Sequence, residues 1–383
     1  MSSKYAEVGV DVKKKGTEVF KPVLKSLFPR AFCPITRDPN LPKYGMVLHT
    51  DGAGSKPIQN YLHWRETGES RWFQSIAYDV MAMNIDDVMC VGATPLGFVD
   101  YVAVNRLRVP KEELLAALNT GFKECFSILK KHGIKISFLG GETADLPDQL
   151  RTLDVSGIIS ARVELSKVIS GEKIGQGDII IGLRSGGRTR YERQENSGIM
   201  CNGITLARHC LMKNEYERKY PELKDPDAKS YYGRFAFDDY LDELDMTVGE
   251  AILSPTRIFA PVIAKILEKH GKQVTGLVHS TGGGQTKCLG LGKNIHYLKD
   301  DLIEPDPIFR LIQREAKVSW MEMFQDFNMG VGFEIIARKK SVDEILATTE
   351  RFGIGAKVIG RCEKSDGGNG LTIKSEFGKF EYR

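Results

Sequence analysis

The loop at residues 51–56, Asp-Gly-Ala-Gly-Ser-Lys, combines three groups that can bind a phosphate and a metal ion. Its glycines let backbone N–H groups approach a phosphate closely, the carboxylate of Asp51 can hold Mg²⁺, and Lys56 can neutralise phosphate oxygens. The spacing differs from the P-loop pattern G-x-x-x-x-G-K-[ST]. Because Asp-Gly-x-Gly is also a common turn sequence, the loop alone leaves both interpretations open.

Three aspartates interrupt the otherwise mostly apolar stretch 75–91. Its apolar residues recur at helical spacing, which predicts a helix, and Asp79 and Asp86 lie two turns apart on nearly the same face. Carboxylates among apolar neighbours are costly to bury unless a cation or hydrogen-bond donors accompany them. The alternative is a solvated polar stripe, although the sequence around Asp86 and Asp87 lacks the Lys and Glu residues typical of such a face.

Two further glycine-rich segments directly follow sequences that predict buried strands. The segment 140–145, Gly-Gly-Glu-Thr-Ala-Asp, places carboxylates beside paired glycines, and the segment 279–284, His-Ser-Thr-Gly-Gly-Gly, offers backbone N–H groups to an anion. A lone histidine such as His279 is more often structural than catalytic. Four acidic or glycine-rich segments in one chain together favour a site for a Mg²⁺-bound nucleotide.

Strand and helix patterns alternate along the chain, which predicts a mixed α/β fold. The polar, turn-rich segment 164–178 is the expected domain boundary and divides the chain into domains 1–170 and 171–383. Residues 213–245 are highly charged and weakly periodic, so we expect a surface excursion there. The predicted strands are 44–49, 96–104, 136–139, 153–163, 178–183, 274–278, 332–337, 357–361 and 371–374, and the predicted helices are 75–91, 110–133, 202–212, 255–269 and 342–352.

Composition and charge exclude several classes of protein. The 383 residues are 42% hydrophobic and 27% charged, which is typical of a folded enzyme and not of a disordered chain. Subtracting 50 acidic from 54 basic residues leaves a net charge of +4, too small to favour nucleic acid or a membrane as the partner. The seven scattered cysteines contain no C-x-x-C pair, the chain opens with no signal-peptide pattern, and no apolar run reaches the ~18 residues of a membrane helix. We therefore expect a cytoplasmic protein with reduced thiols.

Taken in order, these segments resemble the phosphoribosylformylglycinamidine cyclo-ligase family, also called the aminoimidazole ribonucleotide synthetases. Members of this family use ATP to close formylglycinamidine ribonucleotide into aminoimidazole ribonucleotide in purine biosynthesis, with release of ADP and phosphate. The resemblance covers most of the chain and rests on Tyr5-x-x-x-Gly9-Val10-Asp11, the segments 50–56 and 79–87, Phe98-Val-Asp-Tyr101, the segment 140–144, Ser254-Pro-Thr-Arg257, the segment 279–284 and Phe327-Asn-Met-Gly-Val-Gly332.

The resemblance implies a two-domain α/β synthetase fold in which domain 1–170 binds ATP and Mg²⁺ and forms a homodimer through its sheet. It implies a small-molecule substrate, with no nucleic-acid or membrane partner. It assigns catalysis to His279, Asp51, Asp87 and Lys56, and Mg²⁺ to Asp51, Asp87 and Glu142. The residues it assigns to ATP are Gly52, Gly54, Asp79, Gly140, Gly141, Glu142, Thr143, Asn202, Thr281, Gly282, Gly283 and Gly284.

Departures from the family pattern leave alternatives open. The region 28–34 lacks the family's G-G-F-G loop, Asp86 stands where the family has asparagine, and the family's short S-G-x-H-S-N-G loop is expanded to 185–203, with Met200 at the position of its histidine. The alternatives are another ATP-dependent member of the superfamily, such as a selenophosphate synthetase or a thiamine monophosphate kinase, and a nucleotide-binding relative without catalytic activity.

The expanded loop 185–203 is basic, and long loops without periodicity are uncommon unless they are functional or disordered. We expect it to be a mobile lid in which an arginine replaces the missing histidine, and a surface insertion is the alternative. Its arginines are Arg188, Arg190 and Arg193.

Overall fold

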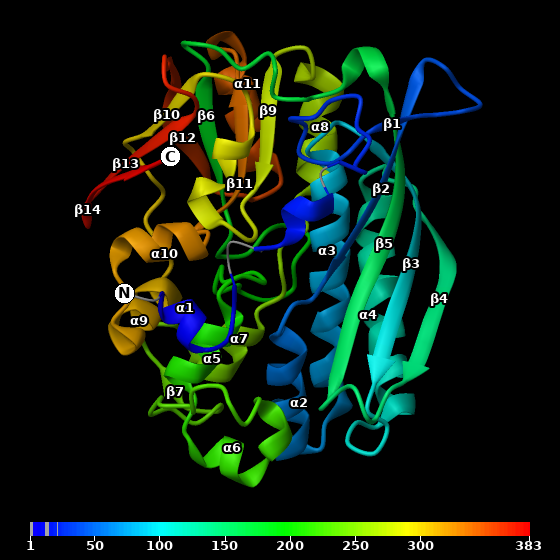
Figure 1. Ribbon diagram of the computed structural model, residues 1–383, viewed down its shortest axis with the longest axis vertical. Helices are drawn as coiled ribbons and strands as arrows, with labels where there is room; N and C mark the ends of the chain where they lie inside the picture. The colour runs from blue at the N-terminus through cyan, green and yellow to red at the C-terminus, as the bar shows by residue number, and fades with distance from the viewer. Residues whose placement is uncertain (1–2, 12–14, 21) are drawn as a thin grey trace.

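The first half of the chain forms a five-stranded sheet with two long helices on one face. The computed structural model describes residues 3–11, 15–20 and 22–383. The prediction that the chain opens with no signal peptide falls partly on residues 1–2, which lie outside the described residues. Helices α3 (Gln74–Met89) and α4 (Lys111–Lys131) pack on the inner face of the sheet (Figure 1). In spatial order the strands are β1 (Thr36–Arg37), β2 (Tyr44–Gly52), β5 (Leu153–Glu164), β3 (Thr94–Val104) and β4 (Ser137–Asp145).

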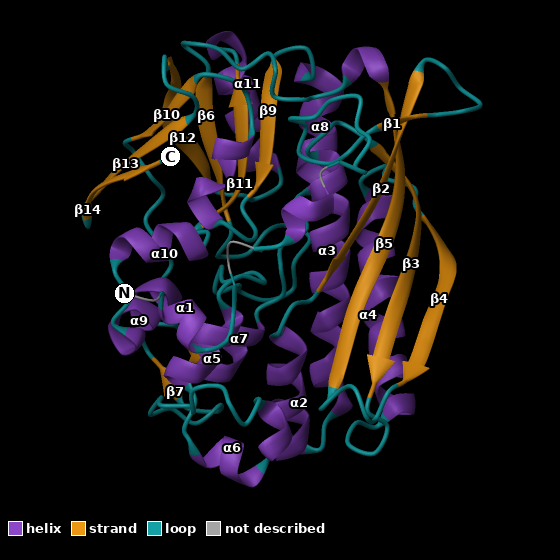
Figure 2. Cartoon of the chain, viewed as in Figure 1, coloured by secondary structure: helices purple, strands orange, loops and turns teal. Residues whose placement is uncertain are grey.

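Side-chain patterns explain why one face of this sheet is covered and the other is not. Every second residue of β5 is buried, and in β2 Val47 is buried whereas Met46 and Leu48 are exposed. Helix α3 is buried on nearly all sides because it lies between the sheet and the second half of the chain (Figure 2). A helix in that position must be apolar all round or must find partners for its polar groups.

The second half forms a seven-stranded mixed sheet, in which β10 and β13 are parallel neighbours and the other neighbouring strands are antiparallel. Helices α8 (Ala260–His270) and α11 (Val342–Arg351) pack together, and α8 also contacts α3 and α4 of the first half. In spatial order the strands are β14 (Gly378–Tyr382), β13 (Gly370–Ser375), β10 (Ile295–Lys299), β12 (Ala356–Lys364), β6 (Ile179–Arg184), β11 (Val331–Ala337) and β9 (Val274–His279).

Most of the shorter helices lie below the second sheet (Figure 1). The remaining α-helices are α1 (Lys4–Glu7), α2 (Lys56–Thr67), α5 (Ile204–Leu211), α6 (Glu215–Lys219), α7 (Val248–Leu253), α9 (Pro307–Ala316) and α10 (Trp320–Asp326). Strand β7 (Tyr240–Leu241) pairs with β8 (Met246–Thr247). The 3₁₀ turns are η1 (Thr17–Phe20), η2 (Ser70–Phe73), η3 (Leu165–Lys167), η4 (Pro221–Leu223), η5 (Gly284–Gly290) and η6 (Lys339–Ser341).

The predicted boundary at residue 170 falls between the two sheets and stays a prediction. The last strand of the first sheet ends at Glu164 and the first strand of the second begins at Ile179. Helix α1 contacts the second half: Lys4 N donates to Glu322 Oε1 (2.7 Å), and Glu7 pairs with Lys229 (2.8 Å). None of the described helices combines the length and apolar character of a membrane span.

Three predicted elements differ from the structure for identifiable reasons. The segment 140–145 is not a loop, because β4 continues through it and pairs with β3 as far as Asp145. The helix expected from Pro255 begins at Ala260, because the N–H groups of Thr256, Phe259 and Ala260 donate to aspartates of α3 and not along a helix. The excursion 213–245 is anchored by buried side chains, namely Tyr216, Tyr220, Leu223, Tyr231 and Phe235.

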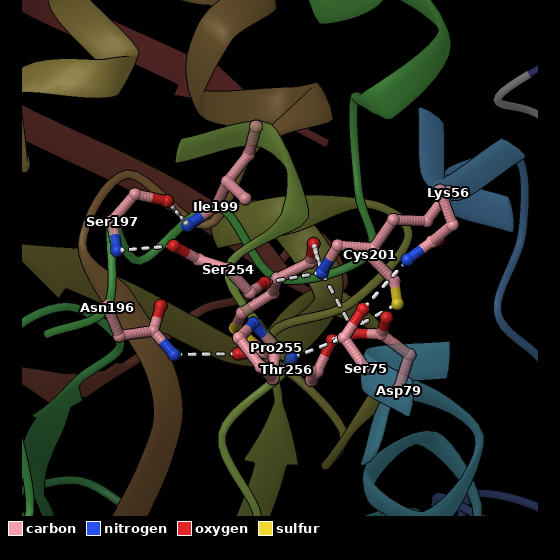
Figure 3. A network of polar contacts seen from close by, with 12 residues as sticks. Lys56, Ser75, Asp79, Asn196, Ser197, Ile199, Cys201, Ser254, Pro255 and Thr256 are labelled. Carbon is pink, nitrogen blue, oxygen red and sulfur yellow. Dashed lines mark hydrogen bonds and ion pairs between the residues drawn. The ribbon is translucent and has the colours of Figure 1, made fainter. Parts of the chain in front are cut away.

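A buried ion pair fastens the two halves together. Lys56 Nζ donates to Asp79 Oδ1 (2.9 Å) and to the carbonyl of Met200 (3.0 Å), and both side chains of the pair are fully buried. Asp79 Oδ1 also accepts from the N–H (2.8 Å) and hydroxyl (2.7 Å) of Thr256 (Figure 3). The pair and its hydrogen bonds therefore join α2 and α3 of the first half to segments 200–201 and 254–256 of the second.

Removing one member of this pair leaves the other charged and buried, so Lys56→Met is expected to destabilise the fold by about 3–5 kcal/mol and to lower the melting temperature by several degrees. The double variant Lys56→Met/Asp79→Asn leaves no buried charge and should melt above the single variant. Lys357→Met is the matched control, because Lys357 pairs with Asp301 (2.6 Å) at the exposed surface and such pairs contribute about 1 kcal/mol or less. Equal melting temperatures for Lys56→Met and Lys357→Met would show that the buried pair contributes no stability.

Candidate functional site

Two aspartates and two histidines meet where β2, α3 and β9 converge. His49 and Asp51 lie two residues apart on the inner face of β2, and Asp87 lies on α3 behind them. Asp87 Oδ2 is 3.3 Å from His49 Nε2, and Asp87 Oδ1 is 2.8 Å from His279 Nδ1 at the end of β9. The ligand atoms of His49, Asp51 and Asp87 all lie within 4.8 Å of one another, which is the spacing of a divalent-cation site. We call these three residues the metal-type cluster.

The surroundings shift the pKa values of the two aspartates in opposite directions. Burial alone would raise the pKa of Asp87, but the charge of Lys287 and hydrogen bonds from His279 and His49 outweigh it and hold the pKa below the ordinary range. Burial and the charge of Asp87 raise the pKa of Asp51. Asp87 is therefore ionised at neutral pH and is the most anionic point of the cluster.

His279 holds Asp87 in place from the second half. Its side chain is fully buried, and burial lowers its pKa in spite of the charge of Asp87, so the ring is neutral at pH 7. A neutral ring carries one N–H, and the short contact to Asp87 places that proton on Nδ1. This geometry supports a positioning role, whereas the resemblance assigned His279 to catalysis.

The glycine segment after His279 faces the cluster from the second half. The N–H of Gly284 donates to the carbonyl of Thr281 (2.8 Å), which closes a turn, and a Cβ at Gly284 would collide with the carbonyl oxygen of Phe327. Gly282 is exposed, and a Cβ there would meet nothing within 4 Å. Asn202 Nδ2 donates to the carbonyl of Ser280 (3.2 Å). These predicted nucleotide-binding residues are therefore brought together.

The predicted loop of the first half lies beside the same cluster. The N–H of Gly52 donates to Asp51 Oδ1 (2.8 Å) and thereby orients that carboxylate. Gly54 has a φ of +59°, which favours glycine, and its Cα faces the carbonyl of Cys201. The loop 51–56 therefore ends against the second half, with Lys56 directed into the interior and not toward the cluster.

Two groups of predicted site residues lie elsewhere. Lys56 and Asp79 are fully buried and paired with each other, so the geometry supports a structural role for both in place of nucleotide contacts. Glu142, with Gly140, Gly141 and Thr143, lies on the edge strand β4, where it is exposed. Asp51 is in register with Gly157, Asp100 and Gly141 across three strand spacings, roughly 14 Å in all. Glu142 therefore does not reach the Asp51–Asp87 cation position within one chain, contrary to the predicted ligand set.

The predicted mobile lid 185–203 is wrong, because the loop is fastened to the second half. The buried guanidinium of Arg257 donates to both carboxylate oxygens of Glu192 (2.9 and 2.7 Å) and to the carbonyls of 184, 186 and 187. Figure 3 shows further anchors, in which the amide of Asn196 donates to the carbonyl of Pro255. The loop arginines point elsewhere: Arg188 lies near Glu195 (4.0 Å), Arg193 pairs with Glu124 (3.1 Å), and Arg190 packs against Gly353.

Sequence reasoning missed two residues of the site, His49 and Lys287. His49 precedes Asp51 by two residues in a predicted strand. Because residues two apart in a strand lie on the same face, the alternation of the strand could have identified His49. Lys287 lies in η5, a 3₁₀ turn after the glycines, and the sequence carries no periodic signal for its direction.

Comparisons with known proteins agree with the fold and its two halves. The family models AIR synthase related protein, N-terminal domain, and AIR synthase related protein, C-terminal domain, match residues 38–163 and 175–372. The fold-class prediction, a mixed α/β two-domain synthetase fold, is confirmed. A solved structure described as AaThiL complexed with AMPPCP and TMP has the same fold, with a TM-score of 0.57, 13% identity and coverage of 98% of this chain and 99% of that one.

Two relatives are more similar in sequence. The phosphoribosylformylglycinamidine cyclo-ligase of Methanocaldococcus jannaschii is 35% identical over 331 residues, which cover 86% of this chain and 81% of the relative. The phosphoribosylformylglycinamidine cyclo-ligase of Methanobrevibacter smithii is 31% identical over 380 residues, with 97% of each chain covered. The chain therefore belongs to the AIR synthase related protein family.

Proposed function

We propose that this protein uses ATP to close formylglycinamidine ribonucleotide into aminoimidazole ribonucleotide, with release of ADP and phosphate, in purine biosynthesis. The observation that carries the proposal is the similarity, at 31–35% identity over 86–97% of the chain, to two proteins named for this reaction. We further propose the cytoplasm as its location. All seven cysteines are free thiols, which suits a reducing compartment.

The chemistry requires an amide oxygen to become a leaving group. The terminal phosphoryl group of ATP is transferred to the formyl oxygen, and an amidine nitrogen then attacks the formyl carbon. The bond between that carbon and the phosphorylated oxygen breaks and phosphate departs. The formyl nitrogen and the attacking nitrogen each give up a proton, and a proton moves from the ring methylene to the exocyclic imine nitrogen, which makes the ring aromatic. The protein's contribution is to align the reactants and to stabilise charge on the phosphoryl oxygens.

The residues of the site fit this task. Asp51, Asp87 and His49 would hold Mg²⁺, which when bound neutralises phosphate oxygens. Carboxylates suit this cation, and the two here offer hard oxygen ligands at suitable spacing. His279 keeps Asp87 oriented. In the segment that follows it, a phosphate between the two halves would meet the N–H groups of Gly282 and Gly283.

A homodimer would explain the exposed part of the first sheet and the position of Glu142. Tyr44, Met46, Leu48, Leu96 and Leu139 are 36–71% exposed on β2, β3 and β4, and we call this patch the outer apolar face. Several large apolar side chains exposed on one sheet are typical of an interface. Since Glu142 lies on the edge strand of the same sheet, it would serve the nucleotide site of a second copy.

The first test is turnover by the purified protein. With ATP, Mg²⁺ and formylglycinamidine ribonucleotide we expect equal amounts of ADP and aminoimidazole ribonucleotide, and with thiamine monophosphate no ADP above background. ADP release with thiamine monophosphate alone would favour a kinase. ATP binding without ADP release would favour a relative without catalytic activity.

The metal assignment predicts different effects for substitutions of the neighbouring carboxylates Asp87 and Asp86 on α3. Asp87→Asn should weaken binding of Mn²⁺, used as a calorimetric probe, and reduce turnover, with a melting temperature near that of the wild type. His279→Asn, which removes the residue that orients Asp87, should weaken binding by about 10–100-fold. Asp86→Asn is the matched control, because Asp86 accepts the N–H groups of Phe259 and Ala260 (2.8 and 2.7 Å) and should affect the melting temperature, not Mn²⁺ binding. An Asp87→Asn variant that melts early yet binds Mn²⁺ normally would contradict the assignment.

The dimer assignment can be tested by mixing two inactive variants, Asp87→Asn and Glu142→Gln. If each site takes Asp87 from one copy and Glu142 from the other, random exchange restores about a quarter of wild-type activity, because half of the dimers are mixed and each has one intact site. Adding Leu48→Glu to both variants should prevent dimerisation, measured by light scattering, and remove the recovery. No recovery after proven exchange would place Glu142 outside the partner's site.

A further inference from the structure

The lysine that the sequence assigned to phosphate neutralisation has no donor left for a ligand. An ammonium group carries three N–H donors, and those of Lys56 already face three acceptors: Asp79 Oδ1 and the carbonyls of Met200 and Ser254. The side chain is fully buried as well. A nucleotide at the metal-type cluster therefore needs a cation from another position.

Lys287 offers such a cation from the second half. Its Nζ donates to Thr281 Oγ1 and lies 4.5 Å from the centre of the Phe32 ring. These contacts use one N–H and orient the ammonium, which forms no salt bridge with a carboxylate of the described residues. The side chain is partly exposed, so two N–H groups remain for a ligand.

The charge of Lys287 acts across the site on the carboxylates. It is the strongest of the influences that lower the pKa of Asp87 against the effect of burial, and it also lowers the pKa of Asp51. Geometry places the ammonium next to the metal-type cluster: Phe32, over whose ring it lies, precedes Cys33, whose Sγ is 3.3 Å from the carbonyl oxygen of Asp87 and 3.8 Å from His49 Nδ1. This arrangement suits an anion that lies between a carboxylate-bound cation on one side and a lysine on the other.

Space and free donors adjoin the ammonium. No atom would contact a Cβ at Gly282, and the N–H groups of Gly282 and Gly283 make no hydrogen bond with the described part of the chain. Lys287, Thr281 and these two N–H groups belong to one short segment, and Gly282 within it is exposed. The four groups are donors or cations of the kind that bind a phosphate.

We propose that Lys287, oriented by Thr281, binds the phosphate chain of the nucleotide opposite the carboxylate-bound cation, in the role that the sequence suggested for Lys56. The proposal rests on the proposed function. It favours the nucleotide over the ribose phosphate of the other substrate, because the cation held by Asp51 and Asp87 must lie beside the same phosphate.

The test is calorimetric binding of Mg²⁺-AMPPCP, a non-hydrolysable ATP analogue, to Lys287→Met, Lys287→Arg and Lys293→Met. Lys287→Met should weaken binding by roughly 10–100-fold, as expected for loss of a charge-assisted hydrogen bond. Lys287→Arg keeps the charge and should recover most of the affinity. Lys293→Met removes an exposed lysine just beyond η5 and should bind normally.

Unchanged AMPPCP affinity in Lys287→Met would overturn the proposal, as would a rise in KM for the ribonucleotide alone. If Lys287→Met does not fold, Thr281→Val keeps the lysine and removes its orienting hydroxyl, and unchanged AMPPCP affinity in that variant would equally overturn it. Turnover of the wild type, measured alongside the variants, separates a failure of the proposed function from a failure of the role of Lys287. An inactive wild type rejects the proposed function. An active wild type, together with a Lys287→Met variant whose AMPPCP affinity is unchanged, rejects only the role of Lys287.

Discussion

The burial of three carboxylates in one helix is the constraint on which the rest of this structure depends. Asp79, Asp86 and Asp87 of α3 are 0, 0 and 4% exposed, and a buried carboxylate must be paired or hydrogen bonded. Much of what satisfies them comes from the second half of the chain, including the N–H groups of Thr256, Phe259 and Ala260 and the ring of His279. Docking of the two halves and assembly of the site are therefore one event.

The three carboxylates differ in what satisfies them, and this difference separates structure from chemistry. Asp79 has a buried ammonium, and Asp86 accepts two backbone N–H groups at the start of α8 while burial raises its pKa. Asp87 is held by imidazole rings, which fix its orientation and leave it anionic beside Asp51. Of the three, only Asp87 has a carboxylate neighbour with metal-ligand spacing. Two aspartates thus hold α3 in place for the third.

Strand and helix positions could be predicted largely from periodicity, because inward-facing residues of β2, β5 and α3 carry the apolar pattern. The cluster of Asp51, Asp87 and His279 could also be predicted, since each belongs to a segment whose composition is unusual for its element. Periodicity did not predict where the other polar side chains point or which residues they contact. Lys56 and Asp79 have the residue types of a nucleotide site, but they pair with each other across 23 positions of sequence. Glu142 does not lie beside Asp51 of its own chain, because strand order, which no local pattern encodes, places β4 at the far edge of the sheet.

The departure at Met200 can now be understood from its backbone. The family's histidine is missing there, but the carbonyl of Met200 accepts from Lys56, and its side chain is 1% exposed within the core. Its φ of +59° is unusual for a residue with a side chain and turns the chain so that this carbonyl meets the ammonium. The expanded loop 185–203 carries its own anchor, the pairing of Glu192 with Arg257. The loss at Met200 therefore falls on the interface that joins the two halves, while Asp51, Asp87 and the glycines of 282–284 are left in place.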